Sequence, residues 1–198
     1  MTLPRPAAAP ETAKPAGADL LVQIAAGLAE GRDLRGLLDR LLEPVVMLAG
    51  AQAGAVRLLS ESGERLQLVS DVGLPSAVHR CESTVDRHCG ACGDAADARR
   101  IVWSSDLRAC AARGGDAFFG QTCHRLLAVP LQHRGRVLGV YNLFFADDVD
   151  PPPHVMALLR SVGELLGLAL VNARLEAESL RATVMHERQM MAAEIHDS

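Results

Sequence analysis

The spacing of hydrophobic positions changes along the chain and predicts how it is divided. Between residues 19 and 42, apolar residues recur mostly every three or four positions, which is the period of one helical face. The Gly-Arg-Asp segment at 31–33 interrupts this pattern, so we predict two helices, with Asp33 capping the second and Leu34 as its first residue. Residues 1–17 are rich in proline and alanine without an apolar period, and we expect a disordered lead-in there.

The middle of the chain has short apolar runs separated by turn residues, a pattern typical of antiparallel strands. The clearest case is a pair of apolar runs around an Arg-Gly-Arg turn at 134–136, which predicts a hairpin. Residues 74–100 have no regular period. The predicted strands cover residues 53–60, 65–72, 101–103, 126–133 and 137–145.

From Pro151 to the end the pattern is helical again, and proline is tolerated in the first turn of a helix. Apolar residues stepping by three and four resemble a coiled-coil seam, which predicts a parallel homodimer through this helix. The alternative is an amphipathic helix packed on its own domain. Together the elements predict an α+β fold: an antiparallel sheet with helices packed on one face, then a long coiled-coil signalling helix. The seam residues are Leu159, Val162, Leu166, Ala169 and Ala173, continued less regularly by Leu180 and Val184.

Composition narrows the function classes. Aromatic residues make up 3% of a chain that is 49% hydrophobic, so the core must be aliphatic. The net charge of −4 argues against direct binding to nucleic acid. The most apolar stretch, 155–171, contains Arg160 and Glu164 and is too short for an uncharged membrane span, and no cationic start precedes an apolar run at the N-terminus. We therefore expect a cytoplasmic protein whose cysteines are not structural disulfides.

Residues 126–145, which read LLAVPLQHRGRVLGVYNLFF, resemble the hairpin of GAF domains, in which an apolar-Val-Pro-Leu strand and a Gly turn precede a Gly-containing strand. The strand ending in Asp106 and the segment 50–75 are similar to other parts of that family. The resemblance covers roughly residues 20–172. It implies a small-molecule-sensing GAF domain over residues 18–172.

Residues 187–198 resemble the phosphoacceptor box of sensor histidine kinases of the nitrate/nitrite-sensor type. Met190 and Ala193 depart from it, since the family often has arginine there. The resemblance implies that His196 is the phosphoacceptor, with Asp197 as its acid/base partner and Glu194 as a further site residue. A neutral imidazole can attack a γ-phosphate while an adjacent carboxylate accepts its proton, although composition alone also produces exposed His-Asp pairs. The matching positions are Glu187, Arg188, Met191, Ala192, Glu194, Ile195, His196 and Asp197.

These resemblances imply the sensory region of a histidine kinase that ends just past its phosphoacceptor, with residues 173–198 as signalling helix and start of the dimerisation domain. Its partners would be a second copy, the ATP-binding domain of the full-length parent and a response regulator. The chain has no Gly-rich nucleotide lid and is not expected to phosphorylate itself. The alternative function is a stand-alone ligand-binding GAF regulator that dimerises without kinase activity.

The cysteines allow three interpretations. A single Cys-x-x-Cys, at 89–92, does not suffice for a zinc ribbon. An iron–sulfur or other soft-metal site is one hypothesis, reversible oxidation of Cys89 and Cys92 is the second, and buried thiols acting as small hydrophobes are the third. Under these interpretations the protein holds either an iron–sulfur cluster or no cofactor. Bilin attachment at Cys123-His124 and methionine sulfoxide reductase chemistry are disfavoured, because the surrounding motifs are missing. The candidate ligands are Cys81, Cys89, Cys92, Cys110 and Cys123.

Overall fold

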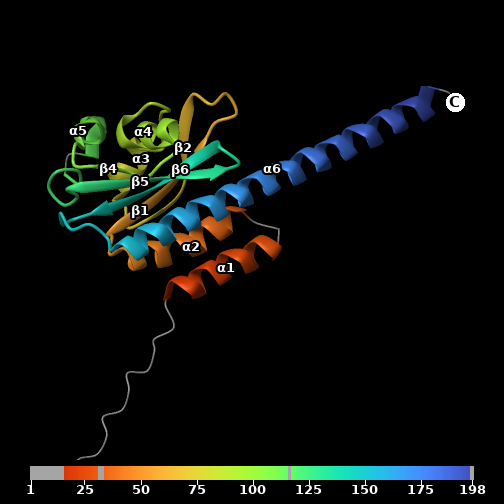
Figure 1. Cartoon of the computed structure of the whole chain (residues 1–198). Coiled ribbons are helices and arrows are strands. Elements are labelled where there is room, and N and C mark those ends of the chain that lie inside the picture. The colour runs from red at the N-terminus through yellow and green to blue at the C-terminus, as the bar shows by residue number, and fades with distance from the viewer. Residues whose placement is uncertain (1–15, 31–33, 116, 197–198) are drawn as a thin grey trace, which may run out of the picture.

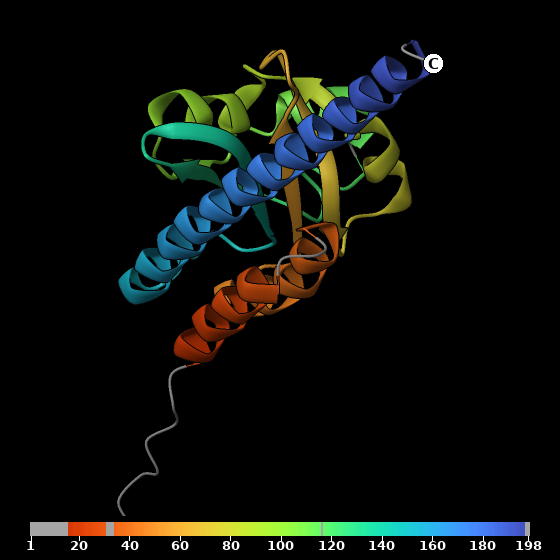
Figure 2. The same cartoon turned by 90° about the vertical axis from the view of Figure 1, so that its right-hand side faces the viewer.

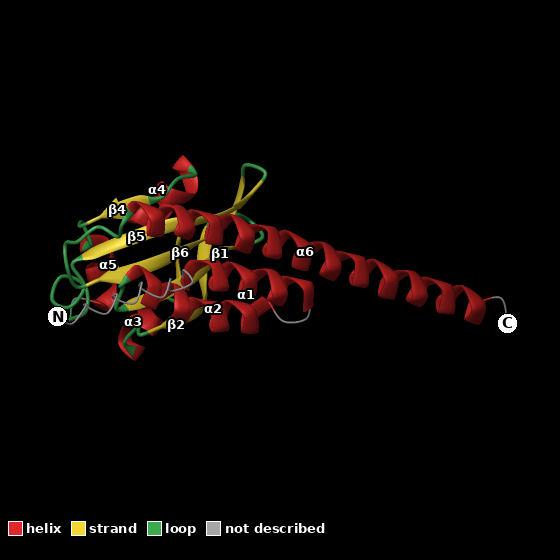
Figure 3. Cartoon of the chain, turned by 60° about the horizontal axis from the view of Figure 1, so that its bottom comes forward, coloured by secondary structure: helices red, strands yellow, loops and turns green. Residues whose placement is uncertain are grey.

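In the described part of the chain, a six-stranded antiparallel sheet lies between two layers of helices (Figures 1 and 3). The computed structural model describes residues 16–30, 34–115 and 117–196. In chain order the elements are α1 (Ala16–Glu30), α2 (Leu34–Ala49), β1 (Ala53–Leu59), β2 (Arg65–Val72), α3 (Ser76–Cys81), β3 (Thr84–Asp86), α4 (Gly90–Ala98), β4 (Val102–Ser104), α5 (Arg108–Cys110), η1 (Ala111–Gly115), β5 (Arg125–His133), β6 (Arg136–Phe145) and α6 (Pro153–His196).

The strand order is β3-β2-β1-β6-β5-β4, so β1 and β6 form the centre of the sheet. Ala55 on β1 lies opposite Asp71 on β2 and Asn142 on β6. The tight β5–β6 turn has positive φ at both Arg134 and Gly135, 48° and 76°. This is the backbone that a two-residue type I′ hairpin turn requires. The predicted hairpin is therefore confirmed.

Alternation along the strands gives the sheet two separate cores. On β1, Val56 packs into the core shared with α1, α2 and α6, whereas Ala53 and Ala55 pack into the core under α3 and α4. On β6, Tyr141 packs into the first of these cores and Phe144 packs into the second. The sequence predicted helices on one face of the sheet. The structure differs from this prediction, because short helices also cover the second face.

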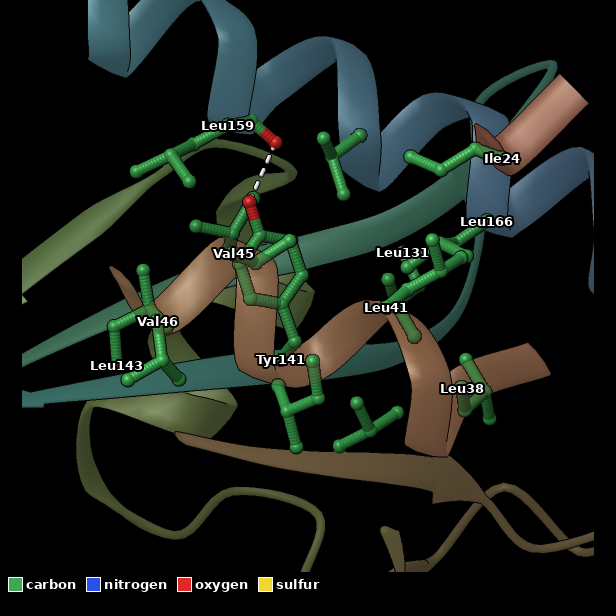
Figure 4. Close-up of a cluster of buried hydrophobic side chains, with 14 of the residues drawn as sticks. Ile24, Leu38, Leu41, Val45, Val46, Leu131, Tyr141, Leu143, Leu159 and Leu166 are labelled. Carbon is green, nitrogen blue, oxygen red and sulfur yellow. Dashed lines mark hydrogen bonds between the residues drawn. The ribbon is translucent and has the colours of Figure 1, made fainter. Parts of the chain in front are cut away.

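A buried hydrogen bond ties the long helix to the centre of the sheet. The hydroxyl of Tyr141 donates to the main-chain oxygen of Leu159 on α6 at 2.6 Å (Figure 4). Burial raises the pKa of Tyr141 well above its ordinary value, so the hydroxyl keeps its proton and remains a donor. The side chains around this bond are almost entirely aliphatic.

Two glycines let α6 lie unusually close to β5. A Cβ at Gly163 would sit 2.6 Å from the main-chain oxygen of Pro130, and one at Gly167 would meet the backbone of Gln132. Both glycines face the strand, because four residues are about one helical turn. The absence of side chains at these positions brings the helix and strand backbones into contact.

Helix α6 continues well past the sheet and ends far from the domain (Figures 1 and 3). Figure 2 views the domain from the side toward which this helix extends. The first predicted seam positions, from Leu159 to Ala169, are buried against the chain's own sheet, so packing within the domain accounts for them. Beyond it, Leu175, Leu180 and Val184 are exposed by 58%, 67% and 40%. A coiled-coil seam between two copies would therefore have to use these later residues.

The part of α6 from Pro153 to His186 is long and apolar enough to cross a membrane by length and composition. However, 44% of its most apolar window is buried inside this domain. A core helix of a folded domain meets the same two criteria, and the hydrophobic residues of the first part of α6, from Val155 to Leu170, pack into the core beside the sheet.

The predicted fold class is confirmed, and the predicted strands agree with β1, β2, β4, β5 and β6 to within about a residue. Helix α1 begins at Ala16, slightly before the expected period, and α2 begins at Leu34 as predicted. The proposed cap Asp33 and residues 1–15 of the lead-in lie outside the described residues. The segment 74–100, which had no clear pattern, forms α3, β3 and α4.

Candidate functional site

The face of the sheet under α3 and α4 contains a polar cluster where an apolar core would be expected. Arg57 on β1 has the same orientation as Ala53 and Ala55, and Asn142 on β6 is opposite Ala55. Arg57 and Asn142 are only 2% and 1% exposed. Charged residues are rarely buried to this extent without a partner, so each partner is informative.

Glu82, which follows α3, binds two arginines at once. Arg57 donates to its carboxylate at 2.9 Å and also to its main-chain oxygen. Arg113 in η1 donates to the other carboxylate oxygen at 2.6 Å. We call these three residues the Arg57–Glu82–Arg113 triad. It joins a central strand to two segments of the covering layer.

The triad carries one net positive charge in a largely buried place. Burial opposes the charge on Arg113, but its hydrogen bond to Glu82 and the carboxylate charge raise its pKa above the ordinary value, so its guanidinium stays charged. Two guanidinium groups then face one carboxylate. Because charges in a region of low dielectric are costly unless balanced, this excess of positive charge favours a nearby negative group.

Three of the five cysteines interact electrostatically with this triad. Cys92 on α4 is buried, and the amide of Asn142 donates to its sulfur at 3.3 Å. Burial raises the pKa of the Cys92 thiol, while the positive charge of Arg57 and the Asn142 hydrogen bond oppose that rise. Burial, followed by the charge of Glu82, raises the pKa of Cys110 to about 12.

Cys89 differs from the other two thiols because it is only half-buried and lies at a helix start. It is the N-cap of α4, three residues before Cys92. Helix N-termini favour negative charge. Gly93 lets α4 pack closely on the preceding segment, because a Cβ there would lie 2.5 Å from the main chain of His88. An accessible thiol thus stands one turn before a buried one.

The remaining cysteines lie elsewhere. Cys81 is exposed at the end of α3, and Cys123 is buried beside β5, where its sulfur donates to the main-chain oxygen of Arg125 at 3.3 Å. Burial raises the pKa of Cys123 to about 11, against the opposing effect of backbone hydrogen bonds. All five cysteines are free thiols.

Nearby histidines are occupied by carboxylates rather than by cysteines. His79 pairs with Asp71 at 2.6 Å and His88 with Asp97 at 3.0 Å. Within the described residues, no group of three or more His, Cys, Asp or Glu is arranged to hold a metal ion. The arrangement of the five candidate cysteine ligands therefore gives no support to the metal hypothesis, which stays a prediction.

The same layer of the domain also has an open cleft of about 300 Å³. Its walls come from α3, the loop after β2 and the segment around Phe118, and they include Val78 and Thr122. The mixed apolar and polar lining is typical of a small-molecule site. Phe118, Phe119 and Phe144 form an aromatic cluster behind it, with ring centroids 5.1–5.9 Å apart.

The predicted phosphoacceptor segment lies at the far end of α6. His196 is the last residue of that helix and Glu194 lies within it, while Asp197 is outside the described residues. The described positions of this segment place it at a distance from the triad and the cleft (Figure 1). Within the described chain, α6 is the element that joins this segment to the domain.

Sequence reasoning did not identify Arg57, Glu82, Arg113 or Asn142. Arg57 and Asn142 did leave a signal, because each interrupts an apolar strand at a position that faces inward. Glu82 and Arg113 lie in irregular segments without periodicity, so only the fold reveals their contacts. The CxxC spacing did indicate Cys89 and Cys92.

Two unequal layers of helices around one antiparallel sheet, with buried charges and a cleft under the short helices, define the class of this α+β domain. The chain belongs to the GAF domain family, since the family model described as "GAF domain" matches residues 31–171.

Known proteins support this assignment. The sensor histidine kinase YhcY of Bacillus subtilis (strain 168) is 28% identical over 191 residues, which cover 90% of this chain and 48% of the relative. The chain thus spans about half the length of that curated relative. The GAF domain of a phosphoenolpyruvate-protein phosphotransferase from Coxiella burnetii superposes with a TM-score of 0.67 at 15% identity, over 84% of this chain and 99% of that one. Free methionine-R-sulfoxide reductase from Neisseria meningitidis superposes with a TM-score of 0.63 at 18% identity, over 84% and 95%. At these identities the two structures show a shared fold only.

Proposed function

We propose that the chain is the cytoplasmic sensory region of a two-component histidine kinase of the nitrate/nitrite-sensor type. The observation that carries the proposal is the continuity of α6, which begins on the sheet of the GAF domain and runs unbroken to His196. The relation to a sensor histidine kinase supports it. In this proposal residues 1–17 are a lead-in, 18–172 the sensory domain and 173–198 the signalling helix with the start of the phosphoacceptor domain.

In the full-length parent, an ATP-binding domain would supply the phosphoryl group. A nitrogen of His196 attacks the γ-phosphorus of ATP, the bond to the bridging oxygen breaks and ADP leaves, while Asp197 accepts the imidazole proton. Glu194, two residues earlier in the motif, belongs to the same proposed site. A response regulator then takes the phosphoryl group from His196.

The signal would reach α6 through β6. Asn142 faces Cys92 on one side of the sheet, and its neighbour Tyr141 faces α6 on the other side and binds Leu159. A ligand or an oxidised thiol that displaces Asn142 therefore also displaces the residue that holds the helix. Exposed Leu175 and Leu180 on α6 support dimerisation through the later part of the helix.

Autophosphorylation of the full-length parent protein tests the transfer of phosphate to His196. It is followed with ATP that carries a radioactive γ-phosphate. We expect His196→Gln to reduce acid-labile labelling to background, because the attacking nitrogen is lost. His186→Gln is the matched control, since His186 is an exposed histidine on the same helix and should label like the wild type. Labelling that persists in His196→Gln contradicts the proposal. A parent gene that encodes no ATP-binding domain favours the stand-alone regulator instead.

For the signal, we infer ligand or thiol-redox sensing at the triad and its cysteines. In the thiol version, hydrogen peroxide oxidises the Cys89 thiolate to a sulfenic acid with release of hydroxide. The Cys92 thiol then attacks that sulfur, and a disulfide and water form. Two cysteines lose one electron each, and the peroxide is reduced to water.

Mass spectrometry of protein that was purified without oxygen and then treated with peroxide distinguishes thiol oxidation from the other proposed signals. We expect a loss of two hydrogens in the peptide containing Cys89 and Cys92, which Cys92→Ser abolishes and Cys81→Ser does not. Iron in that preparation, with visible absorbance lost in Cys92→Ser, would instead favour the metal hypothesis. An unoxidised, metal-free protein leaves small-molecule binding in the 300 Å³ cleft as the signal.

A further inference from the structure

A second hollow lies at the end of the sheet where α6 leaves the domain. It has a volume of about 410 Å³ and is lined by the β1–β2 turn, the end of α4, the β5–β6 turn and α6. It is separate from the triad, because none of the triad residues lines it. We call it the arginine cleft.

The cleft is strongly basic although the chain as a whole is acidic. Four guanidinium groups from separate segments line it, against the carboxylates of Glu61 and Asp97. The net charge of the whole chain is −4, so this local excess of positive charge is not a property of the composition. The four arginines are Arg87, Arg99, Arg136 and Arg174.

Only part of this positive charge is used within the protein. Arg87 pairs with Asp97 at 3.0 Å, and Arg174 donates to the main-chain oxygen of Leu59 at 3.4 Å. Among the described residues, the side chains of Arg99 and Arg136 have no hydrogen-bond or ion-pair partner. The Nε of Arg87 is buried and likewise unpartnered there. The guanidinium donors of Arg99 and Arg136, which are both exposed, remain available to a ligand.

The backbone at Arg99 gives a second, independent indication. Arg99 ends α4 in the left-handed conformation, with φ of 54°, at a position where glycine is usual. Non-glycine residues adopt this conformation at a cost, and such strain is concentrated at functional sites. Asp97, one of the two carboxylates, is already paired with both Arg87 and His88 and so opposes an anion less.

We propose that the arginine cleft binds a phosphate group, either free or as a phosphate monoester. Arginine forms charge-assisted, often bidentate hydrogen bonds with such an oxyanion, and Arg99 and Arg136 are the direct ligands. Arg174 belongs to α6, so a phosphate held beside it links the two turns to the signalling helix. The binding step goes beyond the proposed function, while its transmission along α6 rests on that function.

Titration calorimetry of this chain at about 0.1 M ionic strength tests binding, with inorganic phosphate and glycerol phosphate as separate probes. We expect Arg99→Gln/Arg136→Gln to weaken binding about tenfold or more. The matched control is Arg100→Gln/Arg134→Gln, which removes two exposed arginines from the same segments but not from the cleft. Each double variant replaces one residue in the left-handed backbone conformation, because Arg134 has a φ of 48° and Arg99 a φ of 54°. The control is therefore matched in this respect as well. The control should bind like the wild type.

The comparison of probes identifies the source of the phosphate. Tighter binding of glycerol phosphate assigns the site to a monoester, and equal or tighter binding of inorganic phosphate assigns it to the free ion. Absence of binding for both probes, or equal weakening in both double variants, overturns the inference. Because calorimetry needs no kinase activity, failure of the His196 experiment would leave this result unaffected, and the reverse also holds.

Discussion

The two faces of the sheet differ in what they bury. Under α1, α2 and α6 the core is aliphatic, and the buried hydroxyl of Tyr141 has a partner on the helix. Under α3 and α4 the core contains two arginines, a glutamate, an asparagine and free thiols. Both faces share the same strands, and neighbouring residues on β6 serve opposite sides. One face therefore supplies the apolar core and the attachment of the helix, while the other contains the polar groups to which the proposed function assigns sensing.

Removing Glu82 should break the polar face most severely. Glu82→Ala leaves Arg57 buried without its carboxylate partner, so we expect a loss of about 3–5 kcal/mol in the free energy of unfolding. Urea unfolding measures it. The control is Asp106→Ala, which breaks an ion pair with Arg108 whose side chains are 58% and 91% exposed, and which should change stability little. Similar losses in both variants would contradict the importance of burial.

On the aliphatic face, Gly167→Ala should separate α6 from β5. The added Cβ meets the backbone of Gln132, which cannot move aside as a flexible side chain could. We expect a net destabilisation of about 1–3 kcal/mol despite the better helix propensity of alanine. Asn172→Ala, at an exposed position of the same helix, provides the control. A Gly167→Ala variant as stable as the wild type would show that the close approach is not required.

A smaller effect is expected for the bond between the sheet and α6. Tyr141→Phe removes the hydroxyl but keeps the ring, so the free energy of unfolding should fall by about 0.5–1.5 kcal/mol. Hydrogen exchange of the amides around Leu159 should rise in the same variant. Unchanged exchange there would mean that Tyr141 does not restrain the helix.

The thiols of the polar face predict a loss of stability at alkaline pH. The pKa of Cys110 is about 12 in the folded chain and about 8.5 when unfolded, so the folded state holds this proton more tightly. Its stabilising contribution is complete below about pH 8.5 and is lost as the pH rises toward 12. Between pH 8 and 10.5, Cys110→Ala should therefore lose stability less steeply than the wild type. Cys81→Ala, at an exposed thiol, should follow the wild type, and identical slopes in all three proteins would contradict the prediction.

The sequence predicted the regular parts of the fold better than the candidate site. The β5–β6 hairpin follows from apolar runs around Arg134-Gly135, and the long helix follows from its period. The covering layer could not be predicted, because α3, α4 and α5 are short and their packing depends on contacts between residues far apart in sequence. Glu82 and Arg113 are 31 residues apart, and no local pattern joins them.

The predicted seam shows the same limit in another form. Apolar residues at helical spacing indicate that a face is buried, but not what buries it. Leu159 and Val162 face the chain's own sheet, whereas Leu180 is exposed and suits a second copy. Only the position of the sheet relative to α6 shows which of these residues are buried within the domain and which are left exposed.

The length of α6 makes it a lever with its fulcrum at the contacts of Gly163 and Gly167 with β5. The arm from Leu170 to His196, roughly 26 residues at about 1.5 Å each, measures about 40 Å. A tilt of about 5° at the fulcrum then moves the far end by about 3 Å, roughly the length of a hydrogen bond. Displacements at the sheet too small to disturb its core are therefore magnified at the tip, which in the proposed kinase carries the nucleophile His196.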